Sequence, residues 1–341
     1  MDHNHNLLNS GKPLMPEEEG RRADDALSGP TPVSSSIIPS EKLANSHIRV
    51  SIARFLDLCG LVYPKSSSHL EFTAHCIQES MDRGYVTPTN DSFKLFIPAG
   101  VAMACTAYGH QPLNVQVFIC FYTAFAIYVD DMSSKDIMAV EQFNHRFVTG
   151  QPQSLELLDH FAALLKLVPD VFSPIAANII TTSTLDFITA QLLENAVKDH
   201  KLETSADRFP IFCRDMSSAS RAYAMFIPPP EVPLIYFLQA LPDCAIFFSN
   251  GNDILSCYKE QVAGEEVNLI CLAAQCRGVH QDVILQELIE QTSKAHHRVL
   301  DVLRPCSASL SAYVSFSQGY IGFHTSLSRY KLDELGLYGE A

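Results

Sequence analysis

The sequence lacks the signatures of several common protein classes. Its ten cysteines include no CxxC pair and no regular spacing, and most lie in apolar runs such as FICFY and LICLAAQC. Such cysteines behave as small buried hydrophobic side chains of a reducing compartment, which argues against a zinc or disulfide framework. Basic charge is also scarce, because 24 Lys and Arg stand against 38 Asp and Glu, a formal net charge of -14. A nucleic-acid-binding protein would need a basic face, so that class is excluded.

Long apolar runs are missing as well. No stretch reaches about 18 uninterrupted apolar residues, and the N-terminal segment has no apolar core of signal-peptide length. We therefore expect no stable membrane insertion and a cytoplasmic location. Residues 1–45 are rich in Ser, Pro, Glu and Asp, and we expect them to form a disordered or loosely ordered arm. Residues 46–341 are predicted to form one domain.

What the sequence does contain is helical periodicity. Apolar residues recur at intervals of three and four over long windows, namely residues 114–131, 173–200, 231–260 and 281–303. Alternation with period two is scarce, and no Asn-Gly or Asp-Gly turn joins two β-branched runs. Several windows are apolar almost all round, as expected for helices inside a bundle. The fold class predicted is therefore all-α.

One apolar window contains the stretch NDILSCYKE, residues 252–260, with polar residues at every fourth position. On a helix, Asn252, Ser256 and Glu260 form an oblique line on one face, since residues four apart drift by only about 40°. Amide, hydroxyl and carboxylate oxygens are hard ligands that suit Mg²⁺. The alternative is a buried helix with satisfied polar groups, or Asn252 capping a break.

A second acidic site ends another apolar window. Asp130 and Asp131 follow about four turns of apolar and aromatic residues, and Asp136 comes shortly after. Adjacent carboxylates at a helix C-terminus repel each other and face the negative end of the helix dipole, and a divalent cation removes both objections. The alternative is a helix that simply emerges into solvent. Two acidic sites facing one cavity would hold a diphosphate from two sides.

Four segments carry a family resemblance. NDILSCYKE matches the NDxxSxxxE metal motif of class I terpene cyclases, and the segments DDMSSKD, RFPIFCRDM and QGYIGFHTSLSRYKLDEL resemble further parts of the fungal trichodiene-synthase-like sesquiterpene cyclases. The resemblance covers about residues 51–335, with the segments in family order. It implies a single-domain class I terpene synthase bundle around an apolar central cavity. It also implies farnesyl diphosphate as the substrate and three Mg²⁺ ions as the cofactor.

The resemblance also implies roles for individual residues. As metal ligands it gives Asp130, Asp131, Asn252, Ser256 and Glu260. As diphosphate-binding and catalytic groups, beside Asp130, it gives Arg214, Lys259, Arg329 and Tyr330. One departure is Ser134, which stands where a DDxxD motif would have an acid. Asp130 is therefore the principal ligand expected of the first site, Asp131 is a ligand or a hydrogen-bonding partner, and Asp136 is left open.

The apolar part of the cavity is predicted from the aromatic residues before the Asp pair. Phe125 and Tyr122 lie roughly one and two turns before Asp130, where substrate carbons would lie, and a ring there stabilises a carbocation by about 0.5–2 kcal/mol. Ordinary core packing is the alternative. Arg221 is a rival to Arg214, and His324 is either a general base or a buried structural histidine.

Two other functions are compatible with parts of the pattern. A chain-elongating prenyl diphosphate synthase shares the all-α bundle, but it needs two aspartate-rich motifs. A non-catalytic helical protein that binds an apolar ligand would explain the apolar interior but not the oxygen ligands. The sequence leaves open the product, the quenching of the last cation by water, and the oligomeric state, for which a homodimer is one option.

Overall fold

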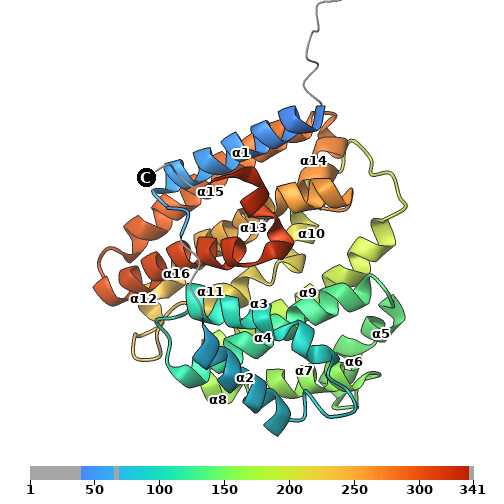
Figure 1. The fold of residues 1–341 in the computed structure, drawn as a ribbon, viewed down its shortest axis with the longest axis vertical. Coiled ribbons are helices and arrows are strands. Elements are labelled where there is room, and N and C mark those ends of the chain that lie inside the picture. The colour runs from blue at the N-terminus through green and yellow to red at the C-terminus, as the bar shows by residue number, and fades with distance from the viewer. Residues whose placement is uncertain (1–39, 65–68, 338–341) are drawn as a thin grey trace, which may run out of the picture. The chain divides into compact units, whose positions relative to one another are not determined.

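The computed structural model describes residues 40–64 and 69–337. In this part of the chain every regular element is helical, and the only β pairing is an isolated bridge between Thr87 and Asn90 (Figure 1). The all-α prediction is confirmed. Most of the arm predicted over residues 1–45 lies outside the described residues, and its last part, from Ser40, belongs to the first helix. The boundaries of the arm and of the domain stay a prediction.

Long helices form the framework. Each of the four apolar windows of the sequence overlaps one of them. The long helices are α1 (Ser40–Cys59), α4 (Leu113–Ser133), α9 (Pro174–Val197), α13 (Leu241–Ala263), α15 (Gln281–Leu303) and α16 (Ser307–Ser326).

Shorter helices and helical turns connect them. The α-helices are α2 (Leu70–Asp82), α3 (Ile97–Ala102), α5 (Ile137–Glu141), α6 (Phe143–Thr149), α7 (Glu156–Lys166), α8 (Val168–Val171), α10 (Phe209–Ser217), α11 (Ser220–Met225), α12 (Ile235–Leu238) and α14 (Leu269–Arg277). The turns are η1 (Ser92–Leu95), η2 (Met103–Ala107, a π-helical turn), η3 (Ser328–Tyr330) and η4 (Leu332–Leu335).

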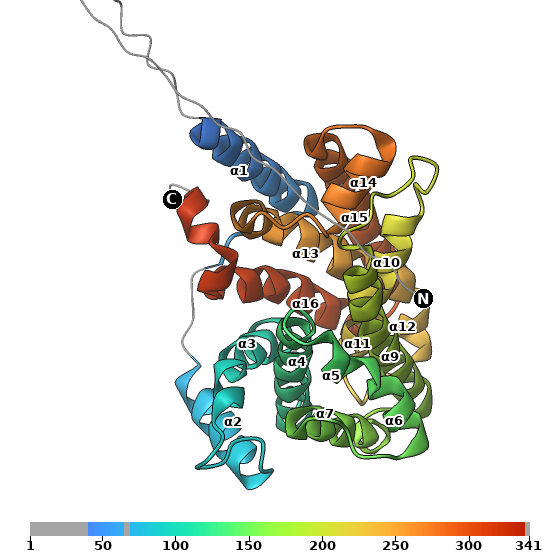
Figure 2. The same ribbon diagram turned by 90° about the vertical axis from the view of Figure 1, so that its right-hand side faces the viewer.

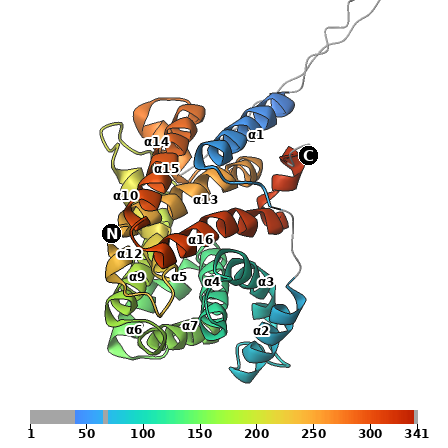
Figure 3. The same cartoon turned by 90° about the vertical axis from the view of Figure 1, so that its left-hand side faces the viewer.

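The packing brings helices from distant parts of the chain together. α13 packs against α15 and α11, α9 packs against α10 and α11, and α4 packs against α3. Figures 2 and 3 show α16 lying between α13 and the α3–α4 pair. The backbones of α16 and η2 come very close, because a Cβ added at Gly319 would lie 1.8 Å from the Thr106 carbonyl oxygen. Glycine is required at this crossing.

α4 is the most apolar of these helices. It is the one described helix that is long and apolar enough to cross a membrane, with a mean hydropathy of 1.5 over its most apolar window. Two thirds of that window, 67%, is buried inside the protein. Core burial therefore accounts for its composition. The helix carries Asp130 near its C-terminal end, directly after the buried Val129.

Candidate active site

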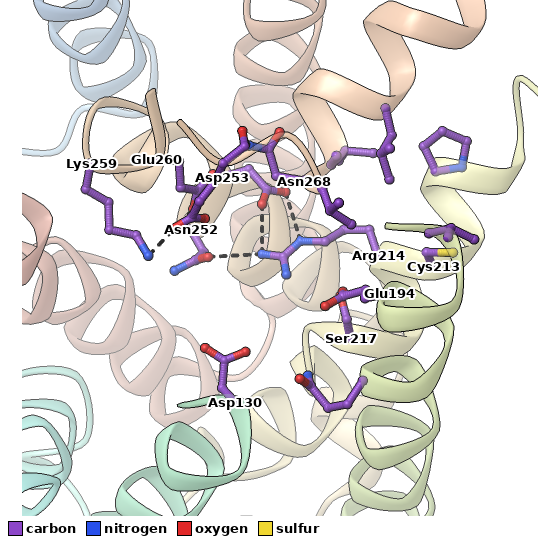
Figure 4. Close-up of a pocket in the computed structure, with 17 residues that line it drawn as sticks. Asp130, Glu194, Cys213, Arg214, Ser217, Asn252, Asp253, Lys259, Glu260 and Asn268 are labelled. Atoms are coloured by element: carbon purple, nitrogen blue, oxygen red, sulfur yellow. Dashed lines mark hydrogen bonds and ion pairs between the residues drawn. The ribbon is translucent and has the colours of Figure 1, made fainter. Parts of the chain in front are cut away.

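A polar cavity of about 160 Å³ lies among α4, α9, α10, α13 and the segment that leads into α14 (Figure 4). Five residues proposed from the sequence line it together, namely Asp130, Arg214, Asn252, Lys259 and Glu260. They come from three helices that are far apart in the sequence. Asp130 of α4 lies more than 80 positions before Arg214 of α10, and Arg214 lies 38 positions before Asn252 of α13. Members of both predicted oxygen-ligand sets, Asp130 from one and Asn252 and Glu260 from the other, therefore line one cavity, whereas Ser256 does not line it. Their role as metal ligands stays a prediction.

The end of α13 supplies the most enclosed part of the site. Ser256 Oγ donates a hydrogen bond of 2.5 Å to Glu260 Oε1, and Lys259 Nζ lies 3.9 Å from the same oxygen. Burial, with the charge of Asp253 nearby, raises the pKa of Glu260 to about 7, although Lys259 and Ser256 act in the opposite direction. A cation placed beside this buried carboxyl group would stabilise its ionised form.

Arg214 projects from α10 toward the same residues. Its Nε donates to Asp253 Oδ2 at 2.9 Å, and its Nη2 donates to the Ser249 carbonyl at 3.0 Å and to Asn252 Oδ1 at 3.1 Å. Burial alone would lower the pKa of Arg214, but the ion pair with Asp253 outweighs it and raises the pKa. The guanidinium is therefore a fixed positive charge in the wall of the cavity.

The rival arginine is engaged elsewhere. Arg221 Nη2 donates to Asp186 Oδ2 at 2.5 Å, and both side chains are about two-fifths exposed, at 45% and 39%. Arg221 is not among the residues that line the polar cavity. Of the two candidate arginines, Arg214 is therefore the one that faces the cavity.

The acidic end of α4 is arranged more loosely. The Asp130 carboxylate is accessible from the cavity, yet protein surrounds it and desolvation raises its pKa; the charges of Arg329 and Lys259 act against this shift. Asp131 is half-buried, and Asp136 is exposed at the start of α5. Neither lines the cavity.

Three acidic residues that line the cavity were missed by the sequence interpretation, namely Asp253, Glu194 and Glu265. Asp253 lies inside NDILSCYKE and pairs with Arg214, and Glu194 lies near the end of α9. Burial raises the pKa of Glu194 to about 7, with Ser217 hydrogen-bonded to it and Asp130 adding repulsion. A signal was present in the sequence, because Glu194 is a carboxylate near the C-terminal end of an apolar helical window, as Asp130 is.

The Arg-Tyr pair lies beside the cavity in η3. Tyr330 is buried, and both Lys259 Nζ and the Arg329 guanidinium carbon lie 5.9 Å from the centre of its ring. Burial raises the pKa of Tyr330 to about 12, so its phenol stays a hydrogen-bond donor at neutral pH. Arg329 is exposed and contributes positive charge at Asp130. Neither residue lines the cavity itself.

Comparison with known proteins agrees with this geometry. The trichodiene synthase family model matches residues 65–340, which is most of the chain. The chain belongs to the trichodiene synthase family. It is 30% identical to alpha-cuprenene synthase COP6 of Coprinopsis cinerea over 84% of this chain and 90% of that protein. It is 36% identical to terpene synthase BipA of Cochliobolus sativus over 70% and 74% of the two chains. The protein is therefore an enzyme of the terpene synthase class.

A solved structure supports the fold. The linalool/nerolidol synthase from Streptomyces clavuligerus superimposes with a TM-score of 0.56, covering 80% of this chain and 99% of that one at 11% sequence identity. At this identity the likeness concerns the fold alone. It confirms the prediction of a class I terpene synthase α-helical fold.

The oxygen donors of the cavity fit Mg²⁺ that is bound together with a phosphate group. Among the described residues no three His, Cys, Asp or Glu side chains are grouped closely enough to hold a metal ion by themselves. The cavity nevertheless presents carboxylate, amide and hydroxyl oxygens, and burial raises the pKa of four of its carboxyl groups, those of Asp130, Glu194, Asp253 and Glu260. Mg²⁺ commonly binds through few protein oxygens and shares its shell with substrate phosphates, so this donor set fits it.

The two aromatic residues proposed for the cavity wall lie in the core. Tyr122 and Phe125 are both fully buried. The Tyr122 hydroxyl is 2.8 Å from Thr184 Oγ1, and the Phe125 ring centre is 4.3 Å from that of Phe93. Neither residue lines the polar cavity, and their contact with substrate stays a prediction.

Proposed function

We propose that the protein is a sesquiterpene synthase that ionises farnesyl diphosphate in a Mg²⁺-dependent reaction and cyclises the resulting carbocation. The observation that carries the proposal is the convergence of Asp130, Asn252 and Glu260 with Arg214 and Lys259 on one cavity. Two cationic side chains, Arg214 and Lys259, lie among the carboxylates of the cavity (Figure 4). This arrangement suits a group that carries several negative charges and brings metal ions with it.

Each part of the cavity has a separate task in this proposal. Asp130 on one side, and Asn252, Ser256 and Glu260 on the other, would hold three Mg²⁺ ions, with Asp131 supporting Asp130. Bound Mg²⁺ supplies the positive charge that turns diphosphate into a good leaving group. Fixed hydrogen-bond donors complete the diphosphate site, and these are Arg214, Lys259, Arg329 and Tyr330.

The reaction then proceeds in the apolar interior. The allylic carbon–oxygen bond breaks, its electron pair leaves with diphosphate, and an allylic carbocation remains. A double bond of the same chain attacks this cation to close a ring. The final cation loses a proton to give a hydrocarbon or takes up water to give an alcohol. Tyr122 and Phe125 are proposed to face the cation from the wall of the interior.

The test is one incubation of the purified full-length chain with farnesyl diphosphate. We expect diphosphate release that requires Mg²⁺ and stops with EDTA, and a sesquiterpene by gas chromatography with mass spectrometry. Geranyl and geranylgeranyl diphosphate serve as length controls, and a clear preference for either would overturn the substrate assignment. Addition of isopentenyl diphosphate tests the alternative, because a chain-elongating enzyme would then form longer prenyl diphosphates. Absence of Mg²⁺-dependent turnover with all three substrates would remove the proposal.

A further inference from the structure

A buried histidine contacts the proposed metal ligand Asn252. His324 lies in α16 and is fully buried. Its Nδ1 is 2.9 Å from the Tyr320 carbonyl oxygen, and its Nε2 is 3.2 Å from Asn252 Nδ2. Both ring nitrogens are therefore engaged by protein atoms. Neither is available to accept a proton from a reacting cation, so the role of general base is not supported.

The two contacts define the hydrogen positions on the ring. A carbonyl oxygen only accepts hydrogen bonds, so Nδ1 of His324 must carry the hydrogen that it donates to Tyr320. In the neutral imidazole Nε2 then presents a lone pair. The group of Asn252 that faces Nε2 must therefore be its NH₂, because the carbonyl oxygen of the amide would oppose the lone pair.

The other side of the amide leads independently to the same orientation. Asn252 Oδ1 accepts from Arg214 Nη2 at 3.1 Å, and a guanidinium has only donors to offer. Figure 4 shows the Asn252 oxygen turned toward Arg214 inside the cavity. The Arg214 guanidinium is itself held in place by Asp253 and Ser249. The His324 ring is held as well, by the Tyr320 carbonyl and by packing 4.5 Å from the Tyr330 ring.

We propose that His324 is a positioning residue that keeps the oxygen, and not the nitrogen, of the Asn252 side chain directed into the cavity. The inference rests on the proposed function, in which that oxygen is a ligand for Mg²⁺. An amide rotated by half a turn presents NH₂, which is no ligand for a cation. Residues that orient metal ligands in this way commonly change metal affinity about 10- to 100-fold when they are removed.

A matched pair of substitutions separates positioning from packing. Glutamine places a side-chain oxygen near the position of Nε2, whereas asparagine reaches only the position of Nδ1. His324→Gln therefore retains an acceptor for Asn252, and His324→Asn loses it. Both are smaller than histidine and neutral, so a loss that comes from packing alone is shared by the two variants.

For His324→Asn we expect the Mg²⁺ concentration for half-maximal turnover to rise about tenfold or more. Thermal stabilisation by Mg²⁺ with inorganic diphosphate, which needs no turnover, should weaken in parallel. His324→Gln should stay within about threefold of wild type in both measurements. Equal Mg²⁺ requirements in the two variants, whether normal or impaired, would overturn the positioning role. A wild-type chain that shows no Mg²⁺-dependent turnover at all would instead remove the proposed function.

The wild-type protein provides a test that does not depend on the folding of variants. Long-range ¹H–¹⁵N spectra distinguish the two neutral tautomers of histidine. We expect His324 to carry its hydrogen on Nδ1. A hydrogen on Nε2 would require the Asn252 oxygen to face the ring, and the proposal would then be wrong.

Discussion

The two oxygen-ligand sets of the cavity differ in how firmly the protein holds them. On α13, the side chains of Asn252, Ser256 and Glu260 are tied to their neighbours before any cation is bound. At the end of α4, Asp130 reaches into the cavity and accepts no side-chain hydrogen bond from the described residues, and Asp136 is exposed. The α13 half is preorganised, whereas the α4 half has to be organised by what binds there. We therefore expect the two halves to respond differently to substitution.

The largest effect is expected on the preorganised half. Glu260→Gln keeps the shape and the hydrogen bond from Ser256 but removes the negative charge. Turnover of farnesyl diphosphate should fall at least about 100-fold, roughly 3 kcal/mol of transition-state stabilisation. Steady-state kinetics at saturating Mg²⁺, with circular dichroism to confirm the fold, provide the measurement. Normal turnover of this variant would show that Glu260 is not a metal ligand.

The α4 half offers its own internal comparison. Asp130→Asn should lower turnover by at least about tenfold to 100-fold, because the only acidic residue of α4 that lines the cavity loses its charge. Asp136→Asn should lower turnover less than about twofold, because Asp136 is exposed at the start of α5. Kinetics of both variants at several Mg²⁺ concentrations make the comparison. Similar losses in the two would mean that the segment after α4 folds back when substrate binds.

In the absence of metal, the preorganised half should also make the stability of the folded protein depend on pH. The pKa of Glu260 is about 7 in the folded protein, against an ordinary value of 4.5. Between these values the folded state retains a proton that the unfolded state releases, so stability declines as pH rises from about 4.5 to 7. Glu194 acts in the same direction. Above pH 7 the ionised, buried carboxylate destabilises the protein by about 1–3 kcal/mol.

Thermal unfolding in EDTA between pH 5 and 8 measures this effect. The melting temperature of the wild-type chain should fall across the range, and Glu260→Gln should reduce the fall. The variant should therefore be more stable than wild type at pH 8 while it is far less active. Parallel pH profiles for the two proteins would show that Glu260 is not the group responsible.

The sequence predicted one half of the site better than the other for a physical reason. Asn252, Ser256 and Glu260 are related by the geometry of one helix, so their spacing alone places them on a common face. The partner of Arg214 could not be predicted in this way, because Asp253 lies 39 positions away and next to Asn252 on a different helix face. Glu194 was missed because only the packing of α9 beside α10 brings it to the cavity.

The aromatic residues show a second limit. Tyr122 and Phe125 recur at helical spacing before Asp130, and that pattern suits both a cavity wall and an ordinary core. The all-α class was predicted because four of the six long helices, α4, α9, α13 and α15, repeat an apolar pattern over many residues. Which ring faces a cavity depends on the side chains of other helices, such as Thr184 and Phe93 here.

The C-terminal segment is intermediate between the two halves. Leu332 and Leu335 of η4 are buried, and the Tyr258 hydroxyl donates a 2.9 Å hydrogen bond to Glu334 Oε2. Tyr258 lies on α13 directly before Lys259, so this bond links the preorganised half to the segment that carries Arg329. The segment is docked in this structure, but its attachment includes a hydrogen bond that one substitution can remove.

The smallest effect is therefore expected for Tyr258→Phe, which removes that hydroxyl and leaves the ring in place. A hydrogen bond of this kind contributes about 1 kcal/mol, so the segment should open several times more often. Hydrogen exchange of residues 325–337 should accelerate, and added Mg²⁺ with diphosphate should slow it again. Turnover should change little, but acyclic alcohols should form a larger share of the products, because an open cavity admits water before cyclisation is complete. Tyr236→Phe, at an exposed position on α12, is the matched control and should change neither measurement. Unchanged exchange in Tyr258→Phe would show that Leu332 and Leu335 hold the segment without the hydrogen bond. A changed product ratio without faster exchange would mean that Tyr258 acts in the cavity itself.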